Sequence, residues 1–256
     1  EHCAIVEEFL DLCIISGFAL GASKTKGRIA QIEFEWLRSL CGRDGMQACD
    51  HHLKAVREWG KIEDIGGMRR FLGNFNWVRQ HFPVEYILCL PALTQQVKKN
   101  ATWPMPPKAE RAQKALQKLA EQAMQLYPLD VCAAITRERP LNTVADCSGY
   151  GWGSSDWQLS ANKTKLCVLG QHAGLLTDAQ ARWQPRKAEL FAQKEGARAR
   201  RKQHGRVPAD HWTDHTHLMC DLVAPQADPA VIRWIADIVS DGSTLTNLGG
   251  RSAALA

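Results

Sequence analysis

Apolar residues recur three and four positions apart in three stretches of the chain, the spacing that places them on one face of a helix. These stretches are 2–16, 64–82 and 108–126. The first is followed by Gly17 and the second by Pro83, two residues that end helices. Further helices are expected at about 50–59, from Pro185 onward, and near 229–240.

Strand-like runs dominate after Pro140. They lie at 141–147, 151–159, 164–170 and 211–214, with two shorter ones earlier, around 18–20 and 29–40. Residues 42–45 (Gly-Arg-Asp-Gly) are typical of a turn, and the proline-rich segment 103–107 is typical of a linker. The pattern predicts an α/β (α+β) chain with a helical first half. Its second half would be a mixed sheet with flanking helices, in which the first three strands form an antiparallel meander.

Three carboxylates stand at the ends of these elements. Asp146 ends the run 141–147 before a glycine-rich turn, Glu189 lies in the helical segment after Pro185, and Asp214 ends the run 211–214. Two strand carboxylates and one helix carboxylate can converge on a pair of Mg²⁺ or Mn²⁺ ions. Such a pair clamps the attacking and leaving oxygens of a phosphodiester. The alternatives are an ordinary turn aspartate and a solvated helix glutamate.

A zinc site is the competing interpretation of the segment around Asp214. The candidate ligands are His211, His215, His217 and Cys220. Strand spacing would put the three histidines on one face and Asp214 on the other. No second ligand cluster completes the pattern, since Cys49-Asp50-His51-His52 lies far away in the sequence. The carboxylate interpretation is therefore preferred.

A basic run follows Glu189. Its members are Lys194, Arg198, Arg200, Arg201, Lys202 and Arg206, with only Glu195 against them. Phosphate backbones attract such a patch in a salt-dependent way. Cations also complement the dipole at the end of a helix, where they are simply solvated. The sequence favours neither interpretation, and the formal net charge of +5 is too small to decide between them.

Composition restricts the class of protein. The nine cysteines are odd in number, scattered, and include no Cys-x-x-Cys pair, which indicates reduced thiols in an intracellular protein, cytoplasmic or nuclear. No run of 18 apolar residues occurs, so no membrane span is expected. The chain begins with Glu1 inside a helical pattern, so we expect it to be a fragment or a processed product.

The order and context of the three acids resemble the ribonuclease H domain of reverse transcriptases, most closely those of gypsy-type (LTR) retrotransposon polyproteins. The segments that carry the resemblance are 144–153, 187–192 and 212–215. Residues 68–83 are similar to the family's thumb helix, "FLG…N-[YFW]-x-R-x-F-x-P", and residues 53–59 resemble the start of its thumb. The resemblance extends over essentially the whole chain.

The resemblance implies a palm remnant at 1–48, a thumb with connecting helices at 49–139, and a ribonuclease H-like domain at 140–256. Asp146, Glu189 and Asp214 would hold Mg²⁺ or Mn²⁺ and hydrolyse the RNA of an RNA–DNA hybrid. The expected nucleic-acid contacts are Lys194, Arg198, Arg200, Arg201 and Lys202. No Tyr-x-Asp-Asp occurs, so polymerase activity is not expected.

Two features favour an alternative, a non-catalytic structural or interaction subunit of a larger assembly. Residues 249–256 resemble the family's "G-[KR]-x-N-x-V-A", so a fourth acid would come just after Ala256. Residues 193–196 (Gln-Lys-Glu-Gly) also replace the apolar residues usual in the family. Gly196 is expected to cost about 1 kcal/mol of helix propensity and to leave less helix surface for burial. The partners would then be RNA or other protein subunits.

Overall fold

The computed structural model describes residues 2–18, 31–214 and 228–247. The chain divides into two compact units, Glu1–Phe34 and Glu35–Ala256. The first unit holds helix α1 (His2–Ile15), which confirms the helix predicted at 2–16. No helix in the described ranges has the length and apolar character needed to cross a membrane. The strand-like run at 18–20 falls almost wholly outside the described residues.

A small sheet covers the second half of the predicted run 29–40 and the residues just after it. Its strands are β1 (Glu33–Trp36), β2 (Ser39–Gly42) and β3 (Gly45–Ala48), in that order. Strands β2 and β3 form a hairpin around the predicted turn. Gly45 has a φ of 125°, and a Cβ there would meet the Leu126 carbonyl oxygen at 2.1 Å. A glycine is therefore required where the hairpin meets Leu126.

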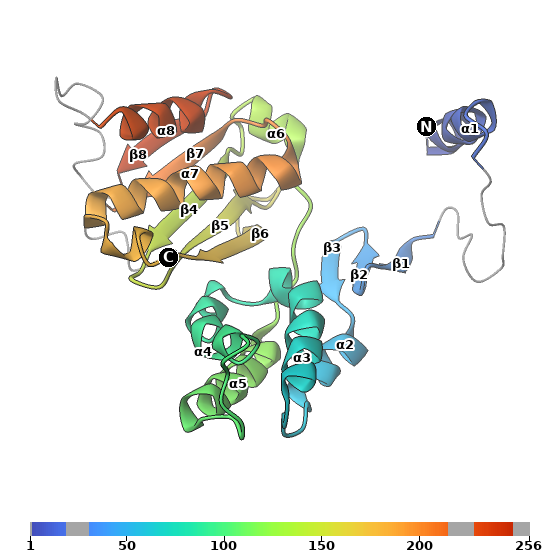
Figure 1. Cartoon of the computed structure of the whole chain (residues 1–256). Helices are drawn as coiled ribbons and strands as arrows, with labels where there is room; N and C mark the ends of the chain where they lie inside the picture. The colour runs from blue at the N-terminus through green and yellow to red at the C-terminus, as the bar shows by residue number, and fades with distance from the viewer. Residues whose placement is uncertain (1, 19–30, 215–227, 248–256) are drawn as a thin grey trace. The chain divides into compact units, whose positions relative to one another are not determined.

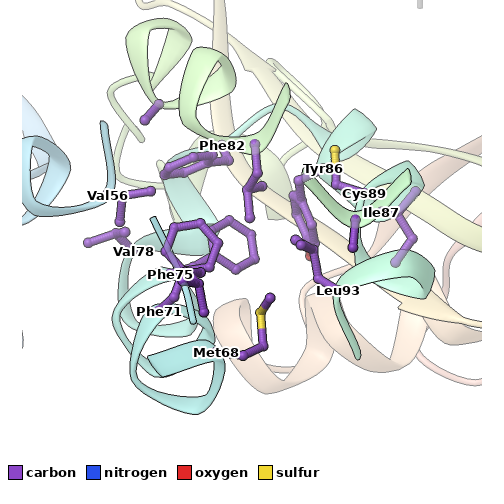
Figure 2. Packing of buried hydrophobic residues seen from close by; sticks show 14 of the residues in the cluster. Val56, Met68, Phe71, Phe75, Val78, Phe82, Tyr86, Ile87, Cys89 and Leu93 are labelled. Atoms are coloured by element: carbon purple, nitrogen blue, oxygen red, sulfur yellow. The ribbon is translucent and has the colours of Figure 1, made fainter. Parts of the chain in front are cut away.

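A helical region follows the hairpin. It contains α2 (Asp50–Arg57), α3 (Ile65–Val78), α4 (Leu90–Gln95) and α5 (Pro107–Leu119), with short 3₁₀ turns η1 (Arg79–His81), η2 (Val84–Leu88) and η3 (Ala120–Gln122). Figure 2 shows its core, in which Met68, Phe71, Phe75 and Val78 of α3 are fully buried. The predicted stripe is confirmed, but α3 ends four residues before Phe82. Phe82 is extended because a following proline disfavours helical backbone.

The strand-rich region forms a five-stranded sheet with the order β6-β5-β4-β7-β8. The strands are β4 (Leu141–Cys147), β5 (Gly151–Leu159), β6 (Leu166–Leu175), β7 (Ala209–Thr213) and β8 (Thr244–Asn247). Strands β4, β5 and β6 are successively antiparallel, which confirms the predicted meander. Strands β7 and β8 add in parallel beside β4. The mixed sheet expected from the sequence is therefore present, with β8 as an unforeseen edge strand.

Three helices flank the sheet: α6 (Val131–Ile135), α7 (Pro185–His204) and α8 (Pro229–Val239). Helix α7 lies across β4 and β5 (Figure 1), and α8 packs against α7. Leu190 and Ala197 of α7 share a buried cluster with Ile235 of α8. The first turn of α8 is capped by Asp228, whose side chain accepts from the Ala230 amide.

The domain boundaries expected at residues 48 and 139 remain predictions.

Helix α7 runs unbroken through the segment expected to weaken it. A Cβ on Gly196 would lie 2.9 Å from the Ser154 Cβ and 3.1 Å from its Oγ. The glycine therefore allows the helix to approach β5 closely. Gln193 is fully buried and hydrogen-bonded rather than solvated. The expectation that residues 193–196 reduce the burial of this helix is wrong, because Gly196 lies where a larger side chain would not fit and Gln193 is buried with its amide hydrogen-bonded.

Candidate active site

Asp146, Glu189 and Asp214 meet at one edge of the sheet. Asp146 is the penultimate residue of β4, and Asp214 directly follows β7. Because β4 and β7 are parallel neighbours, their carboxyl ends lie at the same edge. Glu189 is the fifth residue of α7, the helix that crosses β4. The Asp146 carboxylate is exposed and accepts a hydrogen bond of 2.6 Å from the Cys147 amide.

The charges of the three acids act on one another. The pKa of Glu189 is raised to about 8, chiefly by burial and then by the neighbouring charges of Asp146 and Asp214. The Glu189 carboxyl also shares a hydrogen bond with Asp146. Its Oε2 atom is buried and has no hydrogen-bond partner. A buried carboxylate oxygen without a donor, beside two further carboxylates, is an arrangement that a cation would stabilise.

The donor set fits Mg²⁺ or Mn²⁺. All three side chains offer carboxylate oxygens, the ligands that these hard cations prefer. The chemistry of the residues present therefore fits such a cation. In the described part of the chain, the three acids are not among the groups whose ligand atoms all lie within 4.8 Å of one another.

Gln193 holds the two acid-bearing strands together. The β4–β7 ladder ends at the pair Val144 and Trp212. Immediately beyond it, the Gln193 side-chain amide donates to the Ala145 carbonyl oxygen at 3.2 Å and to the Trp212 carbonyl oxygen at 2.8 Å. Its Oε1 lies 3.3 Å from Nδ1 of the buried His211. Gln193 thus fixes the separation of the strand ends that carry Asp146 and Asp214.

The sequence pattern did not reveal this role of Gln193, because a glutamine there looks like a departure from an apolar helix face. The available signal was its position four residues after Glu189, which places both on the same face of α7. We expect Gln193→Leu to lower hydrolysis and to weaken Mg²⁺ binding together, because one buried and one partly buried carbonyl oxygen lose their donor, at up to about 1–3 kcal/mol each. Phosphodiester cleavage at graded Mg²⁺ concentrations would measure both effects.

The matched control for Gln193→Leu is Gln203→Leu, which makes the same change near the end of α7. The Gln203 amide donates to the Leu169 carbonyl oxygen at 2.8 Å, away from the acids. The control should lose stability without a change in the Mg²⁺ dependence of cleavage. Equal effects of the two variants on Mg²⁺ dependence would contradict a positioning role for Gln193.

An apolar cavity of about 520 Å³ lies beside Asp146. Val84, Ile87, Val144 and Trp212 are among its lining residues. Trp212 also donates from Nε1 to the Asn142 side-chain oxygen at 2.9 Å, so its ring is fixed in place. The glycine-rich turn before β5 serves this packing, because a Cβ on Gly151 would meet Ile87 at 2.7 Å. These glycines allow β5 to contact η2 and do not form a phosphate cradle.

The basic run of α7 divides into buried and exposed residues. Arg200 is fully buried and pairs with Asp241 at 2.7 Å, so its prediction as a phosphate contact is wrong. Arg201 is committed to Asp241 at 2.9 Å and Asp237 at 3.0 Å, and Lys194 pairs with Glu195. A helix side chain that finds a buried acid partner is withdrawn from solvent. Of the predicted set, Arg198 and Lys202 remain exposed.

The exposed cations border a surface hollow. Arg198 and Lys202 line a hollow of about 370 Å³ together with Arg79 of η1 and Trp152 of β5. Arg198 also lies 3.8 Å from the Glu195 carboxylate, with 61% of its side chain exposed. Three cations around one hollow form a surface that could accept phosphates, and Arg79 was not foreseen from the sequence.

The zinc interpretation loses one of its ligands. His211 is fully buried, its ring nitrogen Nδ1 faces Gln193, and burial lowers its pKa to about 4. The remaining candidates, His215, His217 and Cys220, lie outside the described residues, as does the segment 249–256 expected to precede a fourth acid. His211 is part of the support beneath the acids.

Solved structures similar to this chain include foamy viral protease-reverse transcriptases. A foamy viral protease-reverse transcriptase in complex with an RNA/DNA hybrid matches with a TM-score of 0.72 and 13% identity, over 96% of this chain and 33% of that one. The same kind of protein in complex with double-stranded DNA matches with a TM-score of 0.67 and 16% identity, over 96% and 50%. No protein-family model and no curated protein matches.

At such low identity the similarity shows the fold alone, and the chain spans between a third and a half of those chains. The fold is that of the reverse transcriptase and ribonuclease H region, with an RNase H-like mixed sheet. The fold class predicted from the sequence is therefore confirmed. The gypsy-type relationship is a finer assignment that the similarity does not reach.

Proposed function

We propose that this chain is part of a gypsy-type retrotransposon reverse transcriptase, and that its RNase H-like domain hydrolyses the RNA of an RNA–DNA hybrid. One observation carries the proposal. Glu189 is half-buried between Asp146 and Asp214 at the carboxyl ends of two parallel strands, with a buried oxygen that lacks a partner. The similar foamy viral structure, which was solved with an RNA/DNA hybrid, supports the same substrate class.

Each residue has a role in this mechanism. Asp146, Glu189 and Asp214 would hold two divalent ions, which supply an activated water and neutralise the charge developing on the phosphate. Gln193 keeps the ends of β4 and β7 in register beneath them. The Trp212 ring and Val144 make the cavity wall beside Asp146 apolar. Selection of the hybrid would come from 2′-hydroxyl contacts and helix shape, because base edges are not read in this geometry.

Cleavage of a labelled RNA strand tests the proposal directly. We expect weak cleavage in a hybrid with Mg²⁺ or Mn²⁺, none with a chelator, and none of the same RNA free of DNA. We expect faster cleavage from a version extended by a C-terminal aspartate, since four acids neutralise more of the charge of two ions. Hybrid binding without cleavage in the extended version would contradict the enzyme and favour the non-catalytic subunit.

Arg198 and Lys202 are expected to contact phosphates. Replacing both by alanine should weaken hybrid binding, and should reduce the slope of log affinity against log salt by about 1.8, roughly 0.9 per lost contact. Fluorescence anisotropy at several salt concentrations measures the slope. The control is Arg43→Ala with Lys61→Ala, two exposed cations outside α7. An unchanged slope in the Arg198 and Lys202 variant would leave these residues as a solvated helix surface.

A further inference from the structure

A second group of metal-binding side chains lies outside the acidic site. Nε2 of His51 and Nε2 of His52 are 3.7 and 3.9 Å from Oε1 of Glu35. All three ligand atoms lie within 4.8 Å of one another, and within the described ranges no other trio of His, Cys, Asp or Glu is so tightly grouped. The proposed hydrolysis uses none of these residues.

Two elements bring the three side chains together. Glu35 is on β1, and His51 and His52 are in the first turn of α2. Cys49 joins this turn to the hairpin, since its amide donates to the Arg38 carbonyl oxygen at 3.0 Å and its own carbonyl accepts from the His52 amide at 3.0 Å. Consecutive helix residues normally point about 100° apart. Here the two imidazole rings instead lie together, with centroids 3.9 Å apart.

Hydrogen bonding does not account for this arrangement. A nitrogen–oxygen hydrogen bond spans about 2.7–3.2 Å, so both histidine–glutamate distances are too long for one. Tetrahedral zinc with bonds of about 2.0–2.2 Å separates its nitrogen and oxygen ligands by roughly 3.3–3.5 Å. The observed distances are only a few tenths of an ångström longer. The three atoms are therefore spaced for a shared ion.

The ligand atoms indicate which metals the group would bind. Two imidazoles and one carboxylate suit Zn²⁺ and similar transition metals, whereas Mg²⁺ prefers oxygen ligands alone. The donor set thus differs in kind from that of the acidic site.

Cys49 lies next to the same carboxylate, but its sulfur is not among the ligand atoms that all lie within 4.8 Å of one another, so its side chain would have to rotate to reach a shared ion. The side chain is buried, and its thiol hydrogen-bonds to Glu35. Zinc commonly binds two histidines with a thiolate or a carboxylate, and closes its shell at four ligands. Binding would displace the thiol proton to solvent, as metal binding to cysteine does in general.

We propose that Glu35, His51 and His52, with Cys49 as the fourth ligand, bind one Zn²⁺ ion. The ion ties β1 to the first turn of α2. It joins the hairpin to the helical region through four side chains whose backbone positions are already set.

Metal titration of the full chain, without a histidine tag and after chelator treatment, tests this site. We expect one equivalent of Zn²⁺ in competition with a chromogenic chelator, a higher melting temperature with Zn²⁺, and a thiolate-to-metal absorption band with Co²⁺. The His51→Ala, His52→Ala double variant should lose at least tenfold in affinity and the rise in melting temperature. Cys49→Ser should lose the thiolate band.

Two controls make the result specific. Asp50→Asn changes an exposed acid in the same helical turn, which pairs with Arg57, and should bind Zn²⁺ normally. His215→Ala with His217→Ala removes two histidines that precede Cys220 in the sequence and should also bind normally. Undiminished binding by the His51 and His52 variant, a thiolate band that survives Cys49→Ser, or no binding by the unmodified chain would each overturn the proposal.

Discussion

Asp146→Asn should abolish hydrolysis of the RNA strand while leaving the fold intact. The substitution is nearly isosteric, and the amide oxygen can still accept from the Cys147 amide as the carboxylate does at 2.6 Å. It removes one negative charge from a three-acid site. Replacing a residue that only supports a metal ligand typically lowers metal affinity or activity about 10–100-fold. Loss of a direct ligand should therefore lower the cleavage rate at least about 100-fold. Initial rates of hybrid cleavage at saturating Mg²⁺ measure this loss.

Asp178→Asn is the matched control, because it makes the same chemical change at an exposed acid before α7. It should cleave at the normal rate. Thermal unfolding should give the same midpoint for both variants, which separates loss of chemistry from loss of structure. Cleavage that persists in Asp146→Asn would point to a contaminant or a different site.

The convergence of the acids could be predicted because it depends on local patterns. Alternating strands end at Asp146 and Asp214, and a helical segment carries Glu189 between them in the sequence. The parallel pairing of β4 with β7 then brings the strand ends together. The spacing of apolar residues, every second position in a strand or about every 3.6 positions in a helix, can be recognised within a single segment. The position where each segment ends can be recognised in the same way.

The support beneath the acids could not be predicted, because it depends on partners distant in the sequence. Gln193 is polar in a helix face that faces the core, and only the carbonyl oxygens of Ala145 and Trp212 explain it. Strand β8 is short and has no marked alternation, so it is recognisable only as the parallel neighbour of β7. Long-range pairing, not local propensity, decides such elements.

Arg200 shows the same limit for a charged residue. A run of cations on a helix predicts a solvated or phosphate-binding surface, and two of its neighbours on the helix, Arg198 and Lys202, do remain exposed. Its acid partner, Asp241, lies 41 residues further along the chain, beyond α8. Spacing in the sequence gives no sign of that pairing, and so no sign that this arginine belongs to the core.

Arg200→Met should be the most destabilising of the substitutions considered. Arg200 is fully buried and donates to Asp241 at 2.7 Å and to the Ser243 hydroxyl at 3.2 Å. Removing one partner of a buried ion pair costs about 3–5 kcal/mol where the other charge is left unpaired, and the remaining pair between Asp241 and Arg201 should keep the loss at the lower end of that range. Urea unfolding should therefore show a lower midpoint. Arg201→Met, which removes a partly exposed partner of the same aspartate, should cost less.

The pH dependence of unfolding distinguishes loss of the ion pair from loss of packing. Burial alone would raise the pKa of Asp241, but hydrogen bonds from Ser243, Arg201 and Arg200 outweigh it and lower the pKa overall. A lowered pKa in the folded state stabilises the fold above the unfolded value of about 3.9, and this stabilisation disappears as pH falls towards the folded pKa. Arg200→Met should reduce the stabilisation, so the two proteins should differ most in stability near neutral pH and converge at low pH. A difference that stays constant down to the acid limit would assign the effect to packing of the arginine side chain rather than to its charge.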